Sequence, residues 1–266
     1  MNYRVVPSII DHQAEAPPAL GEGISGVWVW DADTRQPAGR RYGLADGCAY
    51  LLFGFDTERA GERDLVHARL IGPRTRPFLI DQRPRLCVGV RIVPGFVQAA
   101  FGIPASELLD QRVDYSLVYA GADAGFARIE AARTDAERVA SVLAVARRRL
   151  RSATRIPPSV RVALAHIAAA EGNVRISSLA DQIGVTRQHL ARQFAVHVGM
   201  SAKQFARIKR AETARARATA TQSAKSGNVN WSRIAHQAGY YDQAHFIKDF
   251  KALTGLTPGS WIRPIR

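Results

Sequence analysis

The sequence predicts an α+β protein with a β-rich N-terminal domain and an all-helical C-terminal domain. Two observations carry this expectation. Apolar and polar residues alternate in short runs over the first ~95 residues, which is the period of half-buried strands. From residue 159 onward the apolar residues recur at helical spacing instead. Residues 152–158 hold two prolines and few apolar residues, so we expect a linker there and domains at 1–155 and 156–266.

Three alternating runs in the N-terminal domain predict strands, at residues 26–30, 65–70 and 86–92. Both tryptophans of the first run fall on one face. Turn-forming Gly, Pro and Asp residues separate the runs. Short strands with such turns favour a small antiparallel barrel or sandwich.

Two amphipathic helices are expected after these strands, at residues 96–101 and 135–151. The second helix carries an apolar stripe that could pair two copies of the chain in a homodimer or pack on its own barrel. Both alternatives stay open. The stripe consists of Val139, Val142, Leu143, Ala146 and Leu150.

The composition excludes several classes of protein. No run of about 18 apolar residues appears, so we expect no membrane span, and the N-terminus has no signal-peptide pattern. Cys48 and Cys87 are too few for a disulfide scaffold or a four-thiolate zinc site. The expected compartment is therefore the reducing cytoplasm.

Positive charge is concentrated in the helical domain. Residues 1–155 carry 21 Arg and 18 acidic residues, a net charge of +3, whereas residues 156–266 carry 16 basic and 5 acidic residues, a net charge of +11. A compact basic domain favours a polyanionic partner, because phosphates release counterions when cations bind them. A merely solubilising surface is the alternative.

The helical domain contains an internal repeat. Ala180 precedes Gly184 by four residues, and Ala235 precedes Gly239 by four. In a helix-turn-helix the alanine lets two helices approach closely, and the glycine takes the backbone through the turn, where a Cβ would strain it. The repeat therefore predicts two helix-turn-helix units, the first around residues 176–201 and the second around 231–257.

Each unit also has, in the same order, an apolar residue, a polar cap, two apolar anchors, a terminating glycine, a second cap and an aromatic residue. Two copies are too few for a solenoid, which would be the alternative kind of helical repeat. The matched pairs are Ile176 and Trp231, Thr186 and Asp242, Leu190 and Phe246, Phe194 and Phe250, Gly199 and Gly255, Ser201 and Thr257, and Phe205 and Trp261.

The second helix of each unit, here the recognition helix, presents an outward side that suits DNA bases. Gln can bond adenine, Arg or Lys can reach guanine, and Ala or Ile can meet a thymine methyl. His189 and His245 could contact phosphate or fill the seam between helices. The outward residues are Arg187, Gln188, Ala191 and Arg192 in the first unit, and Gln243, Ala244, Ile247 and Lys248 in the second.

A basic helix at residues 201–218 is expected to join the two units, with a polar loop at 219–230 after it. Such a helix would hold the two recognition helices in successive major grooves, ~34 Å apart.

The sequence GYYDQAHFIKDF at residues 239–250, continued by TGLTP at 254–258, resembles the signature of the AraC/XylS family of transcriptional regulators. The first unit is similar to that family's weaker first repeat, and the resemblance covers roughly residues 159–265. It implies that Gln188, Arg192, Gln243 and Lys248 occupy base-contact positions.

The N-terminal part resembles an uncharacterised domain that precedes this module in many regulators. The residues that carry the resemblance lie at 46–48, 71–77 and 89–95. It implies a cupin-like β fold with no established ligand.

A small-molecule effector pocket inside that fold is one expectation, and plain core packing by the same aromatic residues is the alternative. Arg91 stands out because a strand arginine among apolar neighbours could receive a carboxylate. Candidate lining residues are Trp28, Trp30, Tyr50, Phe53, Phe55, Cys87 and Arg91.

An enzyme is not expected. Metal-dependent cupins need several His and a Glu, whereas this part has only His12 and His67, and no nucleophile motif or phosphate loop appears. We therefore expect no metal, cofactor or catalytic residue.

The sequence thus predicts a cytoplasmic transcription factor that binds specific double-stranded DNA. RNA polymerase is an expected partner, as for an activator, while a small-molecule effector and a homodimer remain open. The alternative is an architectural or nonspecific nucleic-acid-binding protein.

Overall fold

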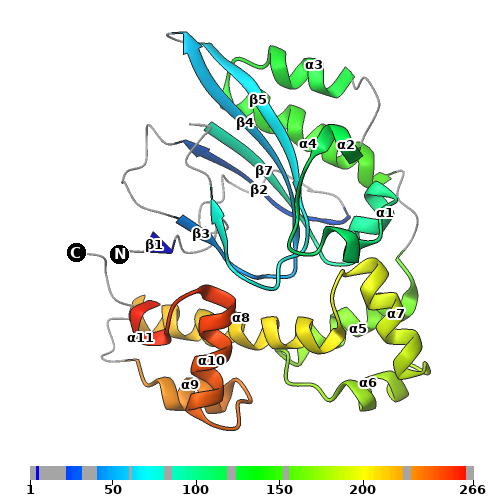
Figure 1. Ribbon diagram of the computed structural model, residues 1–266, viewed down its shortest axis with the longest axis vertical. Helices are drawn as coiled ribbons and strands as arrows, with labels where there is room; N and C mark the ends of the chain where they lie inside the picture. The colour runs from blue at the N-terminus through cyan, green and yellow to red at the C-terminus, as the bar shows by residue number, and fades with distance from the viewer. Residues whose placement is uncertain are drawn as a thin grey trace.

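The computed structural model describes residues 4–5, 22–31, 41–59, 62–80, 86–118, 124–151, 156–223 and 229–261. Figure 1 shows a β-rich domain above and a helical module below, with the N-terminal strands and the last helix on the same side. The expected linker at 152–158 falls partly outside the described residues, because only 156–158 are described.

The N-terminal domain is built on two β-sheets. The larger sheet is antiparallel with the order β2-β7-β4-β5-β8, and the smaller has the order β1-β3-β6, in which β1 runs parallel to β3. All three predicted strands are present. The bounds are β1 Arg4–Val5, β2 Ile24–Asp31, β3 Arg41–Gly43, β4 Ala49–Arg59, β5 Glu62–Ile71, β6 Phe78–Ile80, β7 Leu86–Ile92 and β8 Arg112–Asp114.

The two faces of the larger sheet have different coverings. Side chains alternate along β4, so Phe53 and Phe55 lie in the helix-covered core while Tyr50 points to the opposite face. The prediction that Phe53 and Phe55 share a pocket with Tyr50 is therefore wrong. The opposite face holds a smaller apolar cluster that contains Trp28, Cys48, Tyr50 and Ile71.

Closure of the sheet into a barrel is not seen in the described part of the chain. There β2 and β8 are the outer strands of the larger sheet, and no described strand joins them. The antiparallel sheet is confirmed, and the cupin-like detail stays a prediction.

Five of the described helical segments contribute to the core on one face of the larger sheet, and Figure 1 shows helices along that face. Helix α4 spans the predicted residues, and Val142, Leu143 and Ala146 of its stripe are buried in the core of its own domain. The stripe therefore packs on its own sheet, and a homodimer stays a prediction. The bounds are α1 Val97–Phe101, η2 Ala105–Leu108 (a 3-10 helix), α2 Tyr115–Val118, α3 Ala124–Ala131 and α4 Asp135–Arg151.

The helical module consists of two helix-turn-helix units joined by the long helix α8. The first unit is α6 and α7, supported by α5, and the second is α9 and α10, followed by α11. Each unit packs around its own apolar cluster. The bounds are α5 Pro158–Ala169, α6 Ile176–Gln182, α7 Arg187–His197, α8 Ala202–Ser223, α9 Trp231–Gln237, α10 Gln243–Thr254 and α11 Pro258–Trp261.

Helix α8 is longer than expected, because residues 219–223 are helical rather than part of a loop. Ala218 is fully buried against the second unit, and the Thr221 hydroxyl donates a hydrogen bond to the Arg217 carbonyl at 2.9 Å. This bond satisfies the hydroxyl within the helix, so the polar composition of the segment does not end it. None of the described helices has the length and apolar character needed to cross a membrane.

Candidate nucleic-acid interface

The first unit has the geometry that the repeat predicted. Ala180 is fully buried between α6 and α7, and its carbonyl accepts a hydrogen bond from the Val185 amide at 3.0 Å. Gly184 lies between them with φ 71°, in the left-handed region that glycine adopts without strain. The Thr186 hydroxyl accepts a hydrogen bond from the His189 amide at 3.1 Å and caps α7.

The second unit repeats this geometry bond for bond. Ala235 is buried, and its carbonyl accepts from the Tyr240 amide at 3.0 Å across Gly239, which has φ 78°. The Asp242 carboxylate accepts from the His245 amide at 2.7 Å and caps α10. The predicted internal repeat is therefore confirmed down to the hydrogen bonds of each turn.

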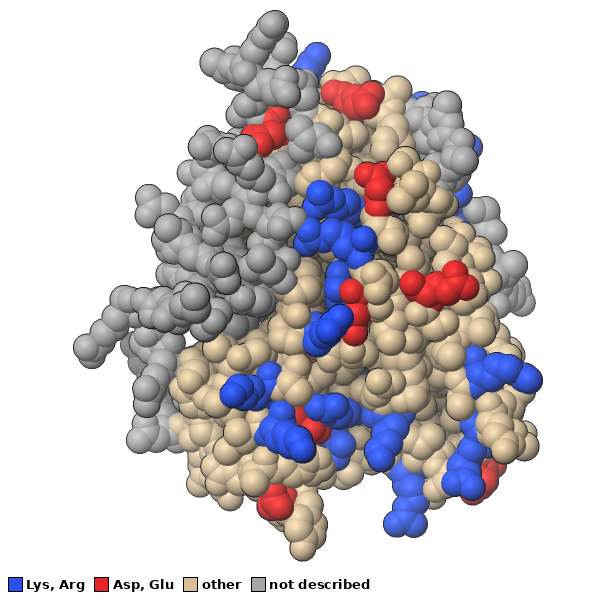
Figure 2. Space-filling view, in the orientation of Figure 1, with Lys and Arg blue, Asp and Glu red and all other residues tan. Residues whose placement is uncertain are grey.

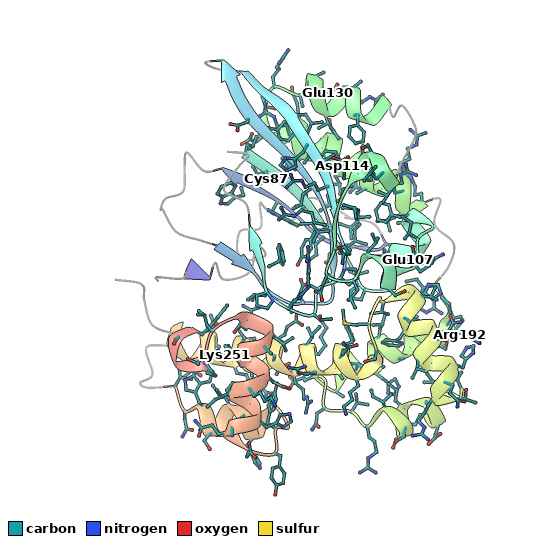
Figure 3. All side chains as sticks on the ribbon, in the orientation of Figure 1. Cys87, Glu107, Asp114, Glu130, Arg192 and Lys251 are labelled. Atoms are coloured by element: carbon teal, nitrogen blue, oxygen red, sulfur yellow. The ribbon has the colours of Figure 1, made fainter. Side chains whose placement is uncertain are left out.

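The outward sides of the N-terminal halves of α7 and α10 are exposed to solvent. Figure 3 shows Arg192 on the outer side of α7. Seven of the eight predicted outward residues are exposed, and Ile247 is the exception because it is half-buried against the core of the second unit. The exposed seven are Arg187, Gln188, Ala191, Arg192, Gln243, Ala244 and Lys248.

The two histidines beside the apolar anchors have different surroundings. His245 packs edge-on against the Tyr240 ring, and its Nε2 lies 3.7 Å from an Asp249 carboxylate oxygen, yet the side chain is exposed. His189 Nδ1 lies 3.5 Å from an Arg192 guanidinium nitrogen, within the outward side of α7.

Tyr241 is an exposed residue that the sequence reasoning missed. It is 94% exposed and directly precedes the cap Asp242, at the outward end of α10. Its position in the turn was a usable signal, because an aromatic residue there has no core position to occupy.

Helix α8 ties the second recognition helix to the rest of the module. The Arg207 guanidinium lies 2.8 Å from the Asp249 carboxylate of α10, and Asp249 is buried. Arg217 of the same helix pairs with Glu171, which follows α5. Figure 2 shows that Lys and Arg outnumber acidic residues over the helical module on the face drawn, in line with its net charge.

The four candidate ligand-binding residues of the N-terminal domain lie on the face of the sheet opposite the helices. Trp28 and Tyr50 are buried and pack edge to face, with ring centroids 5.5 Å apart, while Trp30 is half-buried beside them. Arg91 is on the same face because it pairs with Tyr50 across the two strands.

Arg91 already binds a carboxylate of its own chain. Its guanidinium lies 3.0 Å from the Asp46 carboxylate, which also accepts the Tyr50 hydroxyl and the Cys48 amide, the latter at 3.0 Å. The expectation that Arg91 is open to an external carboxylate is therefore corrected. Burial, and then the Asp46 charge, raise the pKa of Tyr50 well above its usual value.

Two family models match the chain. Residues 179–264 match a helix-turn-helix domain of the AraC type, and residues 12–114 match a domain of unknown function, DUF6597. The chain thus contains an AraC-type helix-turn-helix domain at residues 179–264. This domain supports a DNA-binding transcription regulator. No curated protein matches the chain significantly.

Several solved structures are similar to this chain. The C-terminal domain of AraT, a response regulator from Geobacillus stearothermophilus, is 25% identical over 42% of this chain and 92% of its own, with a TM-score of 0.35. A ToxT variant from Vibrio cholerae is 11% identical over 91% of this chain and 97% of its own, with a TM-score of 0.45. ToxT with a bound unsaturated fatty acid is 11% identical over 91% and 95%, with a TM-score of 0.44.

The match to the AraC-type domain places both recognition helices within one family unit, from α6 to the residues after α11. Within the described ranges, no three His, Cys, Asp or Glu side chains come together as a metal site would need. The exposed side chains on the outward sides of α7 and α10 are basic residues, amides and alanines.

Proposed function

We propose that this regulator reads specific DNA sequences by inserting α7 and α10 into successive major grooves of one duplex. The observation that carries the proposal is the pair of capped helices that follow left-handed glycine turns and expose Arg, Gln, Lys and Ala side chains. These side chains have the donors, acceptors and methyl groups that distinguish base pairs in the major groove.

The first unit is proposed to contribute most of the sequence discrimination. Gln188 and Arg192 can each make a bidentate contact with one base, adenine and guanine respectively. In the second unit Ile247 is half-buried, so Gln243 and Lys248 are left as the polar readers, and lysine carries a single ammonium group. The second unit is proposed to anchor the complex more than to select its sequence.

Selection from a random DNA library with the purified full chain tests this function. We expect an enriched site, with affinity that falls steeply as salt rises and exceeds nonspecific binding by about 10³-fold or more. A ratio near one against competitor DNA would overturn the proposal in favour of an architectural or nonspecific nucleic-acid-binding protein.

A small-molecule effector is proposed for the face of the sheet that carries Trp28, Trp30, Tyr50 and Arg91. An aromatic face with one fixed guanidinium is typical of a ligand site. A ligand carboxylate would have to replace Asp46 on Arg91. Tryptophan fluorescence and melting temperature in a metabolite screen test it. Shifts that the variant Arg91→Met loses support the site, and an unchanged protein in every condition contradicts it.

The remaining parts of the proposal concern the setting of this function. The chain is proposed to act in the cytoplasm without catalysis, to contact RNA polymerase, and to divide into domains at residue 155. Limited proteolysis tests the division, since cleavage is expected within residues 152–158. Stimulation of transcription in a purified polymerase assay tests the polymerase contact, and an unchanged transcript level would count against it.

A further inference from the structure

The N-terminal domain touches both helix-turn-helix units. Next to the first unit, the Ala105 carbonyl lies so close to Gly199 that a Cβ there would be 2.7 Å from its oxygen. At the second unit, the Ala45 amide donates a hydrogen bond to the Leu253 carbonyl of α10 at 3.2 Å. A third contact brings Pro77 to Gly255, where a Cβ would be 3.4 Å away. One domain therefore bridges the ends of both recognition helices.

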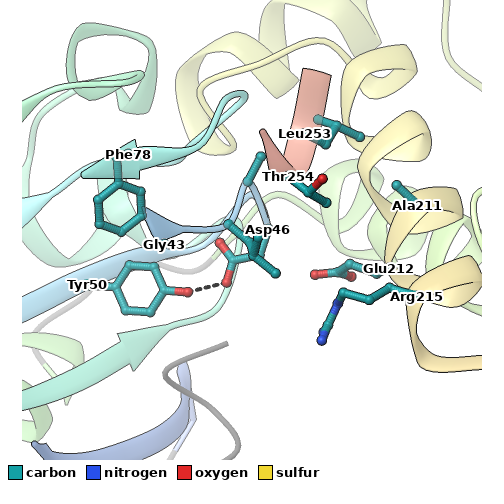
Figure 4. Close-up of a pocket in the computed structure, with 11 residues that line it drawn as sticks. Gly43, Asp46, Tyr50, Phe78, Ala211, Glu212, Arg215, Leu253 and Thr254 are labelled. Atoms are coloured by element: carbon teal, nitrogen blue, oxygen red, sulfur yellow. Dashed lines mark hydrogen bonds between the residues drawn. The ribbon is translucent and has the colours of Figure 1, made fainter. Parts of the chain in front are cut away.

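The same domain also contacts α8 between the units. Gly47 has φ 71°, and a Cβ there would be 3.0 Å from the Phe205 ring of α8. Figure 4 shows the loop with Asp46 facing Glu212 and Arg215 of α8 across a cavity of about 30 Å³. The approach of Gly47 to Phe205 shows that the two surfaces pack against each other beside this cavity.

Charged groups from both sides meet in this contact. On α8, the Lys209 ammonium lies 2.7 Å from the Glu212 carboxylate, and opposite them are Asp46 and Arg91. Burial raises the pKa of Glu212, and Asp46 adds to the rise while Lys209 opposes it. The surface is thus an ordered polar contact rather than a loose apolar one.

Inside the helical module, the two units meet mainly through α8, since each packs around its own cluster. Leu253 of α10 is a link between them, because it joins the cluster of the first unit together with Ala45. Ala45 of the N-terminal domain therefore packs at the place where Leu253 of α10 meets the core of the first unit.

We propose that the docked N-terminal domain fixes the distance and angle between α7 and α10, and thereby sets which spacing between the two half-sites the regulator accepts. The inference rests on the proposed function. The specificity-determining residues are Ala45, Gly47 and Pro77. With Ala105 holding the first unit, a movement of one unit relative to the other breaks either the Ala105 contact or one of the contacts that these three residues make with α8 and the second unit.

Spacing is a demanding test of such rigidity because DNA is helical. One added base pair moves a half-site along the axis by about 3.4 Å and around it by roughly 36°. A rigid pair of recognition helices follows neither movement, whereas a pair held by α8 alone can bend or twist to recover part of the contact.

The experiment measures full-chain binding to the selected site and to versions with one base pair inserted or deleted between the half-sites. For the natural sequence we expect each change to weaken binding by about tenfold or more. The variant Ala45→Arg forces a bulky cation between Leu253 and α8. It should bind the original site within about threefold of the natural protein and lose most of the spacing penalty.

Ala136→Arg is the matched control, because it adds the same charge at an exposed position of α4 and should keep the full penalty. If circular dichroism shows that Ala45→Arg does not fold, the spacing penalty is measured for Pro77→Arg instead. This variant disturbs the contact between the half-buried Pro77 and Gly255. An undiminished spacing penalty in the folded variant overturns the proposal that the N-terminal domain fixes the spacing of α7 and α10. If the natural protein finds no specific site at all, the proposed function fails rather than this inference.

Discussion

The Arg91 guanidinium and the Asp46 carboxylate form a largely buried ion pair, 3.0 Å apart, where the N-terminal domain meets α8. Replacing Asp46 with alanine leaves a buried guanidinium without its charge partner. We expect Asp46→Ala to lower the free energy of unfolding by about 3–5 kcal/mol, measured by urea denaturation.

The double variant Asp46→Ala/Arg91→Met is the control for this prediction. It removes both charges and should recover part of the lost stability, because no unpaired guanidinium is then left buried. Equal stability of the single and double variants would contradict the importance of the pair.

Arg192 is exposed on the outer side of α7, where a guanine is the expected partner. We expect Arg192→Ala to weaken binding to the selected site by about 1–3 kcal/mol and to relax the choice of base at one position. Arg128→Ala, an exposed arginine of α3, should leave binding unchanged. A uniform loss on every sequence would assign Arg192 to phosphate instead.

Gly72 begins a loop that clamps the turn at Asp110, which is held at φ 57°. The Arg74 guanidinium donates to the Asp110 carbonyl at 2.7 Å, and a Cβ on Gly72 would lie 1.8 Å from the Leu108 carbonyl oxygen. Gly72→Ala should therefore cost about 3 kcal/mol or more of unfolding free energy. Gly26→Ala, where a Cβ would meet no atom within 4 Å, should change it by less than about 1 kcal/mol.

The two thiols are expected to be inert in the folded protein. Burial raises the pKa of Cys87 to about 12 and raises that of Cys48 as well, so both stay protonated at neutral pH. A disulfide reagent at pH 8 should react with neither thiol before unfolding and with both in urea. Rapid reaction of one thiol in the native state would contradict this expectation.

The helical module could be predicted almost completely, because its repeat is local. In each unit an alanine lies four residues before the turn glycine, Gly184 or Gly239, and the helix cap follows that glycine within three residues. These short spacings locate both turns and both caps without any distant contact. The end of α8 was misjudged because the polar residues at 219–223 resemble a loop in composition, while burial of Ala218 depends on a partner far along the chain.

The N-terminal domain was predicted less well because its contacts are not local. Alternation identified three strands, yet it could not tell which of the two apolar faces the helices cover, so Phe53 and Phe55 were assigned to the wrong one. Likewise the sequence indicates that Arg91 needs an anionic partner, but it does not identify that partner. Asp46 lies 45 residues away along the chain and is brought to Arg91 by the pairing of β4 with β7.

Helix α8 joins two recognition helices, α7 and α10, that carry different outward side chains. A symmetric dimer reads a palindrome, because the same helix meets each half-site from opposite directions. Here one chain presents α7 and α10 in a set order, with different side chains on each. On the proposed function, a DNA site contacted by both helices has a direction, and reversing that site would turn the N-terminal domain the opposite way along the duplex.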